Sequence, residues 1–224
     1  MSVLPTFSED YNKLLEGGFQ KGIITGIYGE AASGKTLACI LAMLGKDLKG
    51  KKIIYIDTEK GLDLERVKQV SKDYNETLKN LMIFQKKEFP ELKKVCEDLN
   101  RLVNDKFGLI IVDTISAPYR IEIARKSDLK QLNQDFSDLI GNLSAIAKRF
   151  DIPIVVTSQV YADFKEKDKV IPIGGTIFKN RCRCIIEIQK LNLNNRRAII
   201  KKHPSIPEGK YMHFRIVSDG IKGF

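Results

Sequence analysis

The sequence predicts an α/β domain built on a mostly parallel central sheet, and three observations support this prediction. Short apolar runs with strand character alternate with longer stretches whose apolar residues recur every three or four positions. A glycine-punctuated segment at residues 29–36 separates the first such run from the first helical stretch. The length of 224 residues suits one domain, because α/β chains of roughly 200–250 residues often fold as a single unit.

The predicted elements follow one another in a regular order. Strand-like runs lie at residues 21–28, 52–57, 81–84, 108–114 and 152–159. Helical periodicity is found at residues 35–48, 62–74, 91–103 and 129–150. Strands that alternate with helices pair in parallel through right-handed crossovers, and ligands bind at the carboxyl ends of such strands. Three further strand-like runs, at 182–189, 198–203 and 211–217, are expected to extend the sheet in antiparallel fashion.

The chain carries a large positive charge, +10 at neutral pH, from 38 Lys and Arg residues against 28 Asp and Glu residues. Such a surplus attracts polyanions and gives a salt-dependent affinity for phosphate backbones, although many basic proteins bind no nucleic acid. No tract approaches the roughly 20 apolar residues needed to cross a bilayer, and the N-terminus lacks the basic-then-apolar pattern of a secretory signal. We therefore expect a cytoplasmic protein with no membrane partner.

The four cysteines are scattered at positions 39, 96, 182 and 184, with no C-x-x-C pair. Only His203 and His213 could complete a metal site of the zinc type, so we expect no such site and four reduced thiols. The period-2 spacing of Cys182 and Cys184 would place both side chains on one face of a strand, packed in the core.

The segment at 29–36 fits the P-loop pattern G-x-x-x-x-G-K-[ST], and a match by chance in a chain of this length is expected only about once in a hundred. Backbone N–H groups of such a loop and of the following helix face phosphate oxygens. Lys35 would reach the β- and γ-phosphates, and the Thr36 hydroxyl would bind Mg²⁺. The predicted nucleotide-binding residues are Gly29, Glu30, Ala31, Ala32, Ser33, Gly34, Lys35, Thr36 and Leu37.

Two carboxylates complete the predicted chemistry. Asp113 ends the apolar run 109–112, where a carboxylate is costly unless it meets a cation or a hydroxyl, so we assign it to the metal. Glu59 follows the second strand-like run and is the candidate base for the attacking water. A solvated surface glutamate is the alternative for Glu59.

At this point the residues resemble a known family, the RecA-like recombinases, in their archaeal and eukaryotic branch. The resemblance covers nearly the whole chain, and it is specific because of the order and spacing of its motifs. These are residues 14–22 (LLEGGFQKG), the P-loop, IDTE at 56–59, VDT at 112–114, TSQV at 157–160, the glycine pair at 174–175 and HPSIPEG at 203–209.

The resemblance implies roles for four residues. Glu59 takes the position of the catalytic glutamate, and Asp113 that of the Walker B aspartate. Gln159 matches the glutamine that senses the γ-phosphate, and a neutral amide there could gain or lose a bond on hydrolysis. Arg66 matches an arginine that stacks on adenine. A structural glutamine and a solvated helix arginine are the alternatives.

The resemblance also implies two DNA-binding loops, here roughly residues 117–128 and 160–176. The cations that would follow the backbone in these loops are Arg120, Arg125, Lys126, Lys165, Lys167 and Lys169, with Tyr119, Tyr161 and Phe164 available for stacking. Solvated mobile loops are the alternative. Near the C-terminus, residues 201–208, which begin with Lys201 and Lys202, resemble the segment that in this family caps the ATP of an adjacent subunit. That basic cluster could instead touch DNA, or form a simple turn between strands.

The departures from the family pattern shape the expected function. Full-length recombinases carry an N-terminal helical DNA-binding domain and a Phe-x-x-Ala linker motif, whereas only about twenty residues precede the first core strand here. We therefore expect one RecA-like core over residues 1–224, similar to an archaeal recombinase paralogue. Such a protein would be an accessory factor with weak, DNA-dependent ATPase activity. Its expected partners are ATP, Mg²⁺, single-stranded DNA, a full-length recombinase and further copies of itself.

An alternative is a RecA-like ATPase that acts on protein, as in the clock and signalling branch similar to KaiC. A protein of that kind would show no ATP-dependent affinity for single-stranded DNA.

Overall fold

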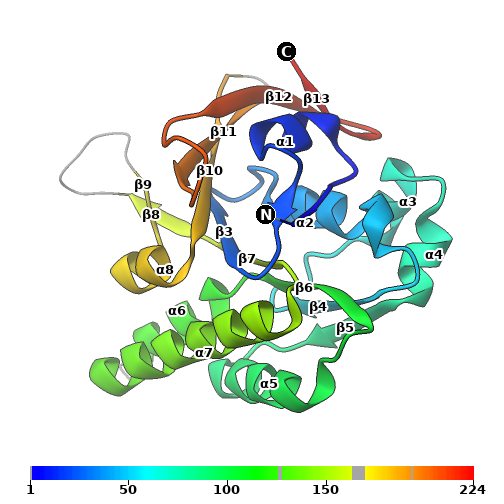
Figure 1. The fold of residues 1–224 in the computed structure, drawn as a ribbon. Coiled ribbons are helices and arrows are strands. Elements are labelled where there is room, and N and C mark those ends of the chain that lie inside the picture. Colours follow the sequence, from blue (N-terminus) through cyan, green and yellow to red (C-terminus); the bar gives the residue numbers. More distant parts are fainter. Residues whose placement is uncertain (1, 126–127, 163–169, 193) are drawn as a thin grey trace.

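The centre of the molecule is a nine-stranded sheet with the strand order β13-β12-β11-β10-β3-β7-β6-β4-β5 (Figure 1). The computed structural model describes residues 2–125, 128–162, 170–192 and 194–224. Helices cover both faces of the sheet in its central part (Figure 1). This architecture confirms the predicted α/β class.

Six neighbouring strands run parallel and match the predicted runs within about three residues at each end. They are β10 (Cys184–Lys190), β3 (Ile24–Gly29), β7 (Ile154–Ser158), β6 (Phe107–Asp113), β4 (Lys52–Asp57) and β5 (Leu81–Gln85). Every residue of β3 and β7 is buried, as expected for parallel strands that are covered on both faces. Because parallel strands end at one edge, the segments after β3, β4, β6 and β7 meet there.

The remaining strands extend the sheet in antiparallel fashion: β11 (Asn195–Lys202), β12 (Tyr211–Val217) and β13 (Gly220–Gly223). The prediction of antiparallel pairing is thus right for β11 and β12. It is wrong for β10, which pairs in parallel with β3 because helix α8 (Gly175–Arg181) carries the chain back before the strand begins. The short β13 was not predicted.

The helices divide between the two faces. One face of the sheet packs against α1 (Glu9–Leu14), α2 (Lys35–Met43), α3 (Leu64–Val70) and α4 (Tyr74–Lys79). The other packs against α5 (Phe89–Leu102), α6 (Ser116–Ala124), α7 (Leu129–Phe150) and α8. Figure 1 shows α5 and α7 side by side below the sheet and α1 near the C-terminal strands. Each face therefore has its own apolar core.

Two predicted helices and one predicted loop differ from the structure for local reasons. The stretch 62–74 forms two helices, because α3 ends at an extended Ser71. The stretch 35–48 was predicted as one helix, but α2 ends at Met43, and residues 46–48 form a separate 3-10 turn, η1 (Lys46–Leu48). The expected loop at 117–128 begins as a helix, α6, which Pro118 can join because a proline in the first turn loses no intrahelical hydrogen bond.

The cysteines are all free and buried, as expected. The prediction that Cys182 and Cys184 share one strand face is wrong, because Cys182 is the C-cap residue of α8 and precedes the strand. The two thiols consequently pack in the cores on opposite faces of the sheet.

Two small sheets complete the fold. β1 (Val3–Leu4) pairs with β2 (Phe19–Gln20), and β8 (Val160–Ala162) pairs with β9 (Val170–Pro172). Within the described ranges, no helix has the length and apolar character that crossing a bilayer would require.

Candidate nucleotide site and nucleic-acid interface

The P-loop connects the end of β3 to the start of α2, as the motif predicts. Gly34 is the N-cap residue of α2 with φ of 111°, a left-handed conformation that glycine adopts at little cost. Gly29 has no room for a side chain, because a Cβ atom there would lie 2.3 Å from the carbonyl oxygen of Ile188 on β10. Backbone geometry therefore requires both glycines.

Lys35 is buried, with 8% of its surface exposed. Its Nζ atom donates hydrogen bonds to the carbonyl oxygens of Gly29 (2.8 Å) and Glu30 (2.7 Å). Burial lowers the pKa of Lys35, and the nearby carboxylates of Asp113 and Glu59 oppose that shift. The ammonium group is thus held over the loop by neutral carbonyls, with its charge available to an anion.

Two further features of the loop fit phosphate. The Ser33 hydroxyl is buried and has no hydrogen-bond partner within the part of the chain that the structure describes. The N–H groups of Lys35, Thr36 and Leu37 lie in the first turn of α2, where a helix offers no acceptor of its own. Phosphate oxygens satisfy donors of this kind. The loop therefore fits the triphosphate of ATP.

Asp113 accepts hydrogen bonds from three hydroxyl groups at the end of β6. Its Oδ2 atom accepts from Thr36 (2.7 Å) and Tyr55 (2.8 Å), and its Oδ1 atom accepts from Thr157. Burial raises the pKa of Tyr55 well above its ordinary value, and the Asp113 carboxylate adds to the shift. Thr36 and Asp113 lie in direct contact, as is needed for two groups that hold one Mg²⁺ ion and its water shell.

Glu59 lies between two polar partners at the same edge of the sheet. Its Oε1 atom accepts a hydrogen bond from Gln159 Nε2 (2.5 Å), and its Oε2 atom accepts one from the Thr114 hydroxyl (3.1 Å). The structure therefore brings together Lys35, Thr36, Glu59, Asp113 and Gln159, which the sequence placed on four separate strand ends.

Asp57, the last residue of β4, was not predicted to matter. Its Oδ1 atom accepts from the N–H groups of Glu59 (3.2 Å) and Gly61 (3.0 Å), and its Oδ2 atom from that of Leu62 (3.2 Å). The carboxylate thereby sets the course of the loop that carries Glu59. An Asp two residues before a candidate base is a signal for such a turn, because Asp side chains commonly bond the backbone N–H two residues on.

Arg66 on α3 is held by the turn between β12 and β13. Its guanidinium group donates to the carbonyl oxygens of Val217 (2.5 Å), Ser218 (2.7 Å) and Gly220 (3.5 Å) and to Gln69 Oε1 (3.0 Å). These bonds use the edge of the group and leave its planar face for stacking. Adenine stacking stays a prediction, now with a defined anchor.

The C-terminal strands reach the P-loop through two side chains that the sequence did not indicate. Arg196 on β11 donates to the carbonyl oxygen of Ala32 (3.3 Å). Lys190 on β10 forms an ion pair with Glu30 (3.4 Å). Both contacts depend on strand order, which one sequence does not reveal.

Gln159 connects the candidate nucleotide site to the predicted DNA-binding segments. Its backbone N–H donates to the Ser116 hydroxyl at the start of α6 (3.0 Å), and its carbonyl oxygen accepts from Ile173 N–H beyond β9 (2.9 Å). Gln159 therefore contacts Glu59 through its side chain, whereas its backbone contacts Ser116, the residue before the first predicted DNA-binding segment, and Ile173 within the second.

The two predicted DNA-binding segments lie next to each other and line one cavity of about 380 Å³. Arg120 and Ile123 of α6 form one wall, and Tyr161, which is 46% exposed, lies on β8 in the other. All three predicted cations of the second segment, Lys165, Lys167 and Lys169, lie outside the described residues, as do Phe164 and Lys126.

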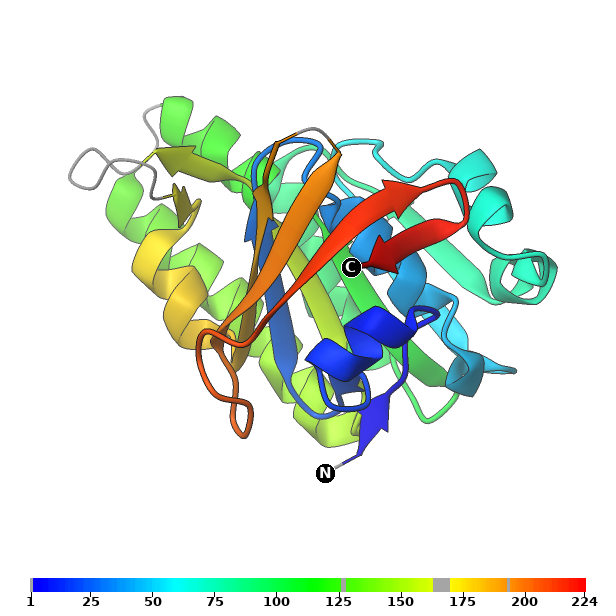
Figure 2. The ribbon, with the colours of Figure 1, turned by 90° about the horizontal axis from the view of Figure 1, so that it is seen from above.

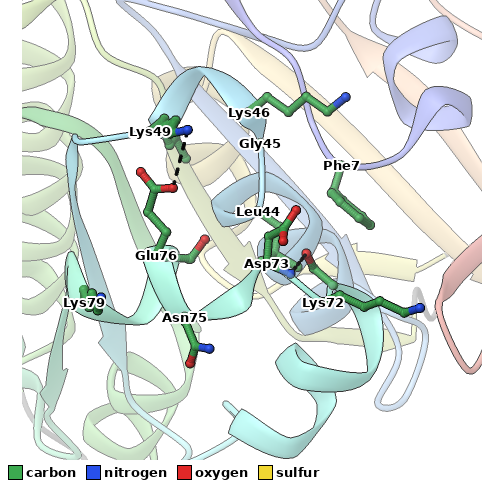
Figure 3. A pocket seen from close by; sticks show the side chains of 13 residues that line it. Phe7, Leu44, Gly45, Lys46, Lys49, Lys72, Asp73, Asn75, Glu76 and Lys79 are labelled. Atoms are coloured by element: carbon green, nitrogen blue, oxygen red, sulfur yellow. Dashed lines mark hydrogen bonds and ion pairs between the residues drawn. The ribbon is translucent and has the colours of Figure 1, made fainter.

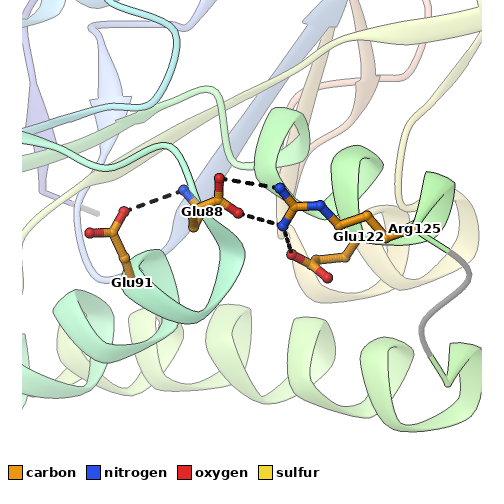
Figure 4. A network of polar contacts seen from close by, with 4 residues as sticks. All are labelled: Glu88, Glu91, Glu122 and Arg125. Carbon is orange, nitrogen blue, oxygen red and sulfur yellow. Dashed lines mark hydrogen bonds and ion pairs between the residues drawn. The ribbon is translucent and has the colours of Figure 1, made fainter.

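Arg125 does not present a free charge to DNA. Its guanidinium group pairs with Glu88 (2.6 Å) and with Glu122 (2.9 Å), as Figure 4 shows. Glu88 in turn forms a capping box with Glu91 at the start of α5 (Figure 4). Arg125 thus ties the end of α6 to α5, and its charge is offset by two carboxylates.

Lys201 and Lys202 are also engaged. Lys201 pairs with the buried Glu187 (3.6 Å), which accepts a hydrogen bond from Tyr28 as well. Lys202 Nζ donates to the carbonyl oxygens of Lys179 (2.9 Å) and Cys182 (2.8 Å) and so binds the last turn of α8. The segment after them is the connection between β11 and β12, in agreement with the turn that the sequence left open.

A hollow of about 900 Å³ lies away from these groups (Figure 3). It is lined by the exposed Phe7, by η1 and by the start of α4, with Lys46, Lys49 and Lys72 at its rim. These segments precede β4 and β5, so the hollow adjoins the amino ends of the strands, opposite the P-loop edge. A choice by cavity volume alone would therefore place the candidate site at the wrong edge of the sheet.

Comparisons with known proteins find relatives that match over nearly the whole chain. The chain is similar to the DNA repair and recombination protein RadB of Methanococcoides burtonii, with 37% identity over 94% of this chain and 93% of the relative. It is 36% identical to the protein of the same name in Thermococcus sibiricus, over 98% of this chain and 95% of that one. The crystal structure of the RadB recombinase superposes with a TM-score of 0.83 at 33% identity, covering 98% of both chains.

The family description Rad51 matches residues 1–224. Members of this RecA-like family are generally P-loop ATPases that bind ATP with Mg²⁺. The full-length match, together with the Lys35, Asp113, Glu59 and Gln159 arrangement, shows that this chain belongs to the Rad51 family of RecA-like proteins.

Proposed function

We propose that this protein is an ATP-dependent DNA-binding factor of homologous recombination and DNA repair, with a slow ATPase activity. The observation that carries the proposal is the position of Gln159, which bonds Glu59 on one side and the α6 and β9 segments on the other. The names of the relatives, which are DNA repair and recombination proteins, support the same role.

The residues of the P-loop edge fit the binding of ATP with Mg²⁺. Lys35, the Ser33 hydroxyl and the N–H groups that open α2 would bind the phosphates, and Arg66 would support the adenine. Thr36 and Asp113 would hold the metal. A bound Mg²⁺ would offset the charge of the phosphate oxygens. Hydrogen bonds hold the side chains of Lys35 and Asp113, so little reorganisation would be needed when nucleotide binds.

Glu59 is the proposed base for the attacking water. It is exposed at the sheet edge, and its two oxygens are oriented by Thr114 and Gln159. A water that approaches the γ-phosphate would take one of these positions, so Gln159 would have to exchange its bond with Glu59 for one with the phosphate or the water. That exchange would move the backbone contacts of Gln159 with α6 and Ile173.

The cavity between α6 and β8 is the proposed DNA contact. Tyr161 could stack on a base, and Arg120 could bind a phosphate. Exposed aromatic groups favour single-stranded DNA, whose bases are open to stacking. We further propose that residues 1–224 act as one core domain and that a full-length recombinase is the partner, with this chain as its accessory factor.

The alternative function, an ATPase of the clock and signalling branch that acts on protein, has less support. The relatives described above are named for recombination, at 36–37% identity over nearly the full length.

A fluorescence anisotropy experiment tests the proposed function. Labelled single- and double-stranded DNA would be titrated with protein in the presence and absence of ATP and Mg²⁺. We expect ATP to raise the affinity for single strands about tenfold, as typical coupling energies of 1–3 kcal/mol allow. In Lys35→Ala this ATP effect should vanish. An affinity that ATP does not change in the parent protein would contradict the proposal.

A further inference from the structure

The outer face of the C-terminal strands has an unusual composition. Strands β11, β12 and β13 contain no Asp or Glu residue. On β12, Tyr211, His213 and Arg215 alternate with residues that pack inward, such as Phe214, whose ring contacts Tyr11 of α1 at 6.3 Å. Figure 2 looks onto these strands, and no described element passes in front of them. The face thus lacks a cover.

Cations and aromatic rings are interleaved on this face. The rings of Tyr211 and His213 lie 5.2 Å apart, and those of His213 and Phe224 are stacked at 5.7 Å. The guanidinium group of Arg197 lies 5.9 Å from the Tyr211 ring, and that of Arg215 lies 5.1 Å from the Phe224 ring. We call this surface the C-terminal face, and it consists of Arg197, Tyr211, His213, Arg215, Lys222 and Phe224.

The positive charges of the C-terminal face are oriented but not neutralised. Arg197 donates to the amide oxygen of Gln189 (2.7 and 3.1 Å), and Arg215 donates to that of Asn195 (2.8 Å). Neutral amides fix the direction of a guanidinium group and leave its charge in place. Lys222 lies directly across from Arg215 and has no ion pair in the described ranges. The face is therefore prepared for an anionic ligand.

Two aromatic rings of the C-terminal face, those of Tyr211 and Phe224, are more exposed than rings that serve only to pack the core. Tyr211 is 56% exposed and Phe224 is 64% exposed, although aromatic residues are usually largely buried. A contiguous exposed apolar patch commonly marks a binding surface. A ligand that is merely acidic would need the cations alone. A ligand with flat faces and a regular series of negative charges uses the rings and the cations together.

We infer that the C-terminal face binds single-stranded nucleic acid without sequence preference, by stacking bases on Tyr211 and Phe224 while Arg197, Arg215 and Lys222 follow the phosphates. Open bases suit these rings, whereas the bases of a duplex are closed to stacking. The inference deepens the proposed function, since it takes nucleic acid as the ligand, and it adds a surface separate from the cavity beside α6.

The test uses the full chain and a fluorescein-labelled oligodeoxythymidine of about 20 nucleotides, more than the roughly 4–16 that one single-strand-binding domain covers. Anisotropy is measured without nucleotide at several salt concentrations. Tyr211→Ala and Phe224→Ala should each weaken binding about tenfold, which corresponds to ~1.4 kcal/mol. Tyr211→Phe keeps the ring and should stay within about twofold of the parent. Arg215→Ala should reduce the salt slope by about 0.7.

The matched control is Phe7→Ala, which removes another exposed aromatic ring, at the hollow near the amino ends of the strands, and should bind as the parent does. Equal affinities of Tyr211→Ala and Phe7→Ala would overturn the inference. So would a loss in Tyr211→Phe as large as that in Tyr211→Ala, or a change of oligomeric state in Tyr211→Ala by light scattering, because the face would then join copies of the chain.

The outcomes also separate this inference from the proposed function. If Lys35→Ala loses the ATP effect while Tyr211→Ala leaves binding unchanged, the C-terminal face alone is refuted. If the parent chain binds the oligonucleotide without nucleotide through Tyr211 but ATP has no effect, the proposed ATP dependence alone is refuted.

Discussion

The P-loop edge of the sheet and the C-terminal face hold their polar side chains in opposite ways. At the P-loop edge, Lys35 and Asp113 are buried, and each is bonded to several neighbours. On the C-terminal face, Arg215 and Lys222 are exposed, and among the residues that the structure describes neither pairs with a carboxylate. Phosphoryl transfer needs groups that are already positioned and shielded from water. Binding of single-stranded nucleic acid without sequence preference needs accessible charge. One sheet thus carries both the candidate nucleotide site and the proposed nucleic-acid surface.

The largest expected effect is at the P-loop edge, the more buried of the two regions. Lys35→Ala should weaken ATP binding about a thousandfold, because truncating one partner of a buried charge contact costs about 2–5 kcal/mol. The unfolding midpoint should not fall, since the change removes a buried charge whose pKa is lowered by desolvation. Calorimetric titration and thermal melts provide the two readouts. Lys72→Ala, at the rim of the hollow in Figure 3, is the matched control, and equal ATP affinities in the two variants would contradict the assignment.

At the P-loop edge, Glu59→Gln should separate ATP hydrolysis from ATP binding. Turnover should fall about a hundredfold, because general-base catalysis commonly contributes 10²–10⁴ in rate, while ATP affinity should change little. Steady-state hydrolysis and nucleotide titration would be measured together. Glu65→Gln, on the exposed side of α3, serves as the control. Parent-like turnover in Glu59→Gln would place the base elsewhere.

Asp113→Ala should destabilise the fold as well as the site. It removes the acceptor for the hydroxyl groups of Tyr55 and Thr157, and an unsatisfied buried donor costs about 1–3 kcal/mol. Urea denaturation would measure the loss. Asp219→Ala, in the exposed turn after β12, should stay within about 0.5 kcal/mol of the parent. A loss of unfolding free energy in Asp219→Ala but not in Asp113→Ala would contradict the structural role assigned to the buried Asp113.

The smallest expected effect concerns His203, in the connection that leads to the C-terminal face. Its Nδ1 atom accepts from the N–H groups of Ser205 (3.2 Å) and Ile206 (3.0 Å), which requires an unprotonated nitrogen. Burial lowers the pKa of His203. The contribution is therefore present above the ordinary value near 6.5 and is lost as the pH falls through the lowered value.

Denaturation at pH 7 and at lower pH should show this loss, by less than about 1 kcal/mol. In His203→Asn, which keeps an acceptor that does not titrate, this part of the pH dependence should disappear. The same pH dependence in parent and variant would exclude His203 as its source.

The parts of the fold that follow from local sequence were predictable. The strand β4 and the helix α7 have the predicted bounds, because periodicity and flanking residues define them. Lys35 and Thr36 were predictable because a strand, a glycine bend and a helix occur in order around them, and Asp113 was predictable because it ends an apolar run. Their mutual contacts follow once parallel strands are assumed.

Contacts between distant segments could not be predicted. Arg125 was predicted as a DNA contact, yet it pairs with Glu88 from a helix that precedes it by one strand. Lys202 was predicted as a DNA contact or as part of an ATP cap, and its bonds to the last turn of α8 were not foreseen. Asp57 and Arg196 were overlooked, since their roles depend on loop conformation and strand order. A single sequence shows which charges exist, but not which are already neutralised.

The anchoring of Arg66 has a consequence for both regions. This side chain is the proposed support for adenine, and it holds the carbonyl oxygens of Val217 and Ser218 at the hairpin that carries Lys222 and leads to Phe224. Any ligand that restrains Arg66 also restrains that hairpin. Thermodynamic reciprocity then requires that an occupied hairpin alters nucleotide affinity by the same factor by which nucleotide alters the hairpin's affinity for its own ligand.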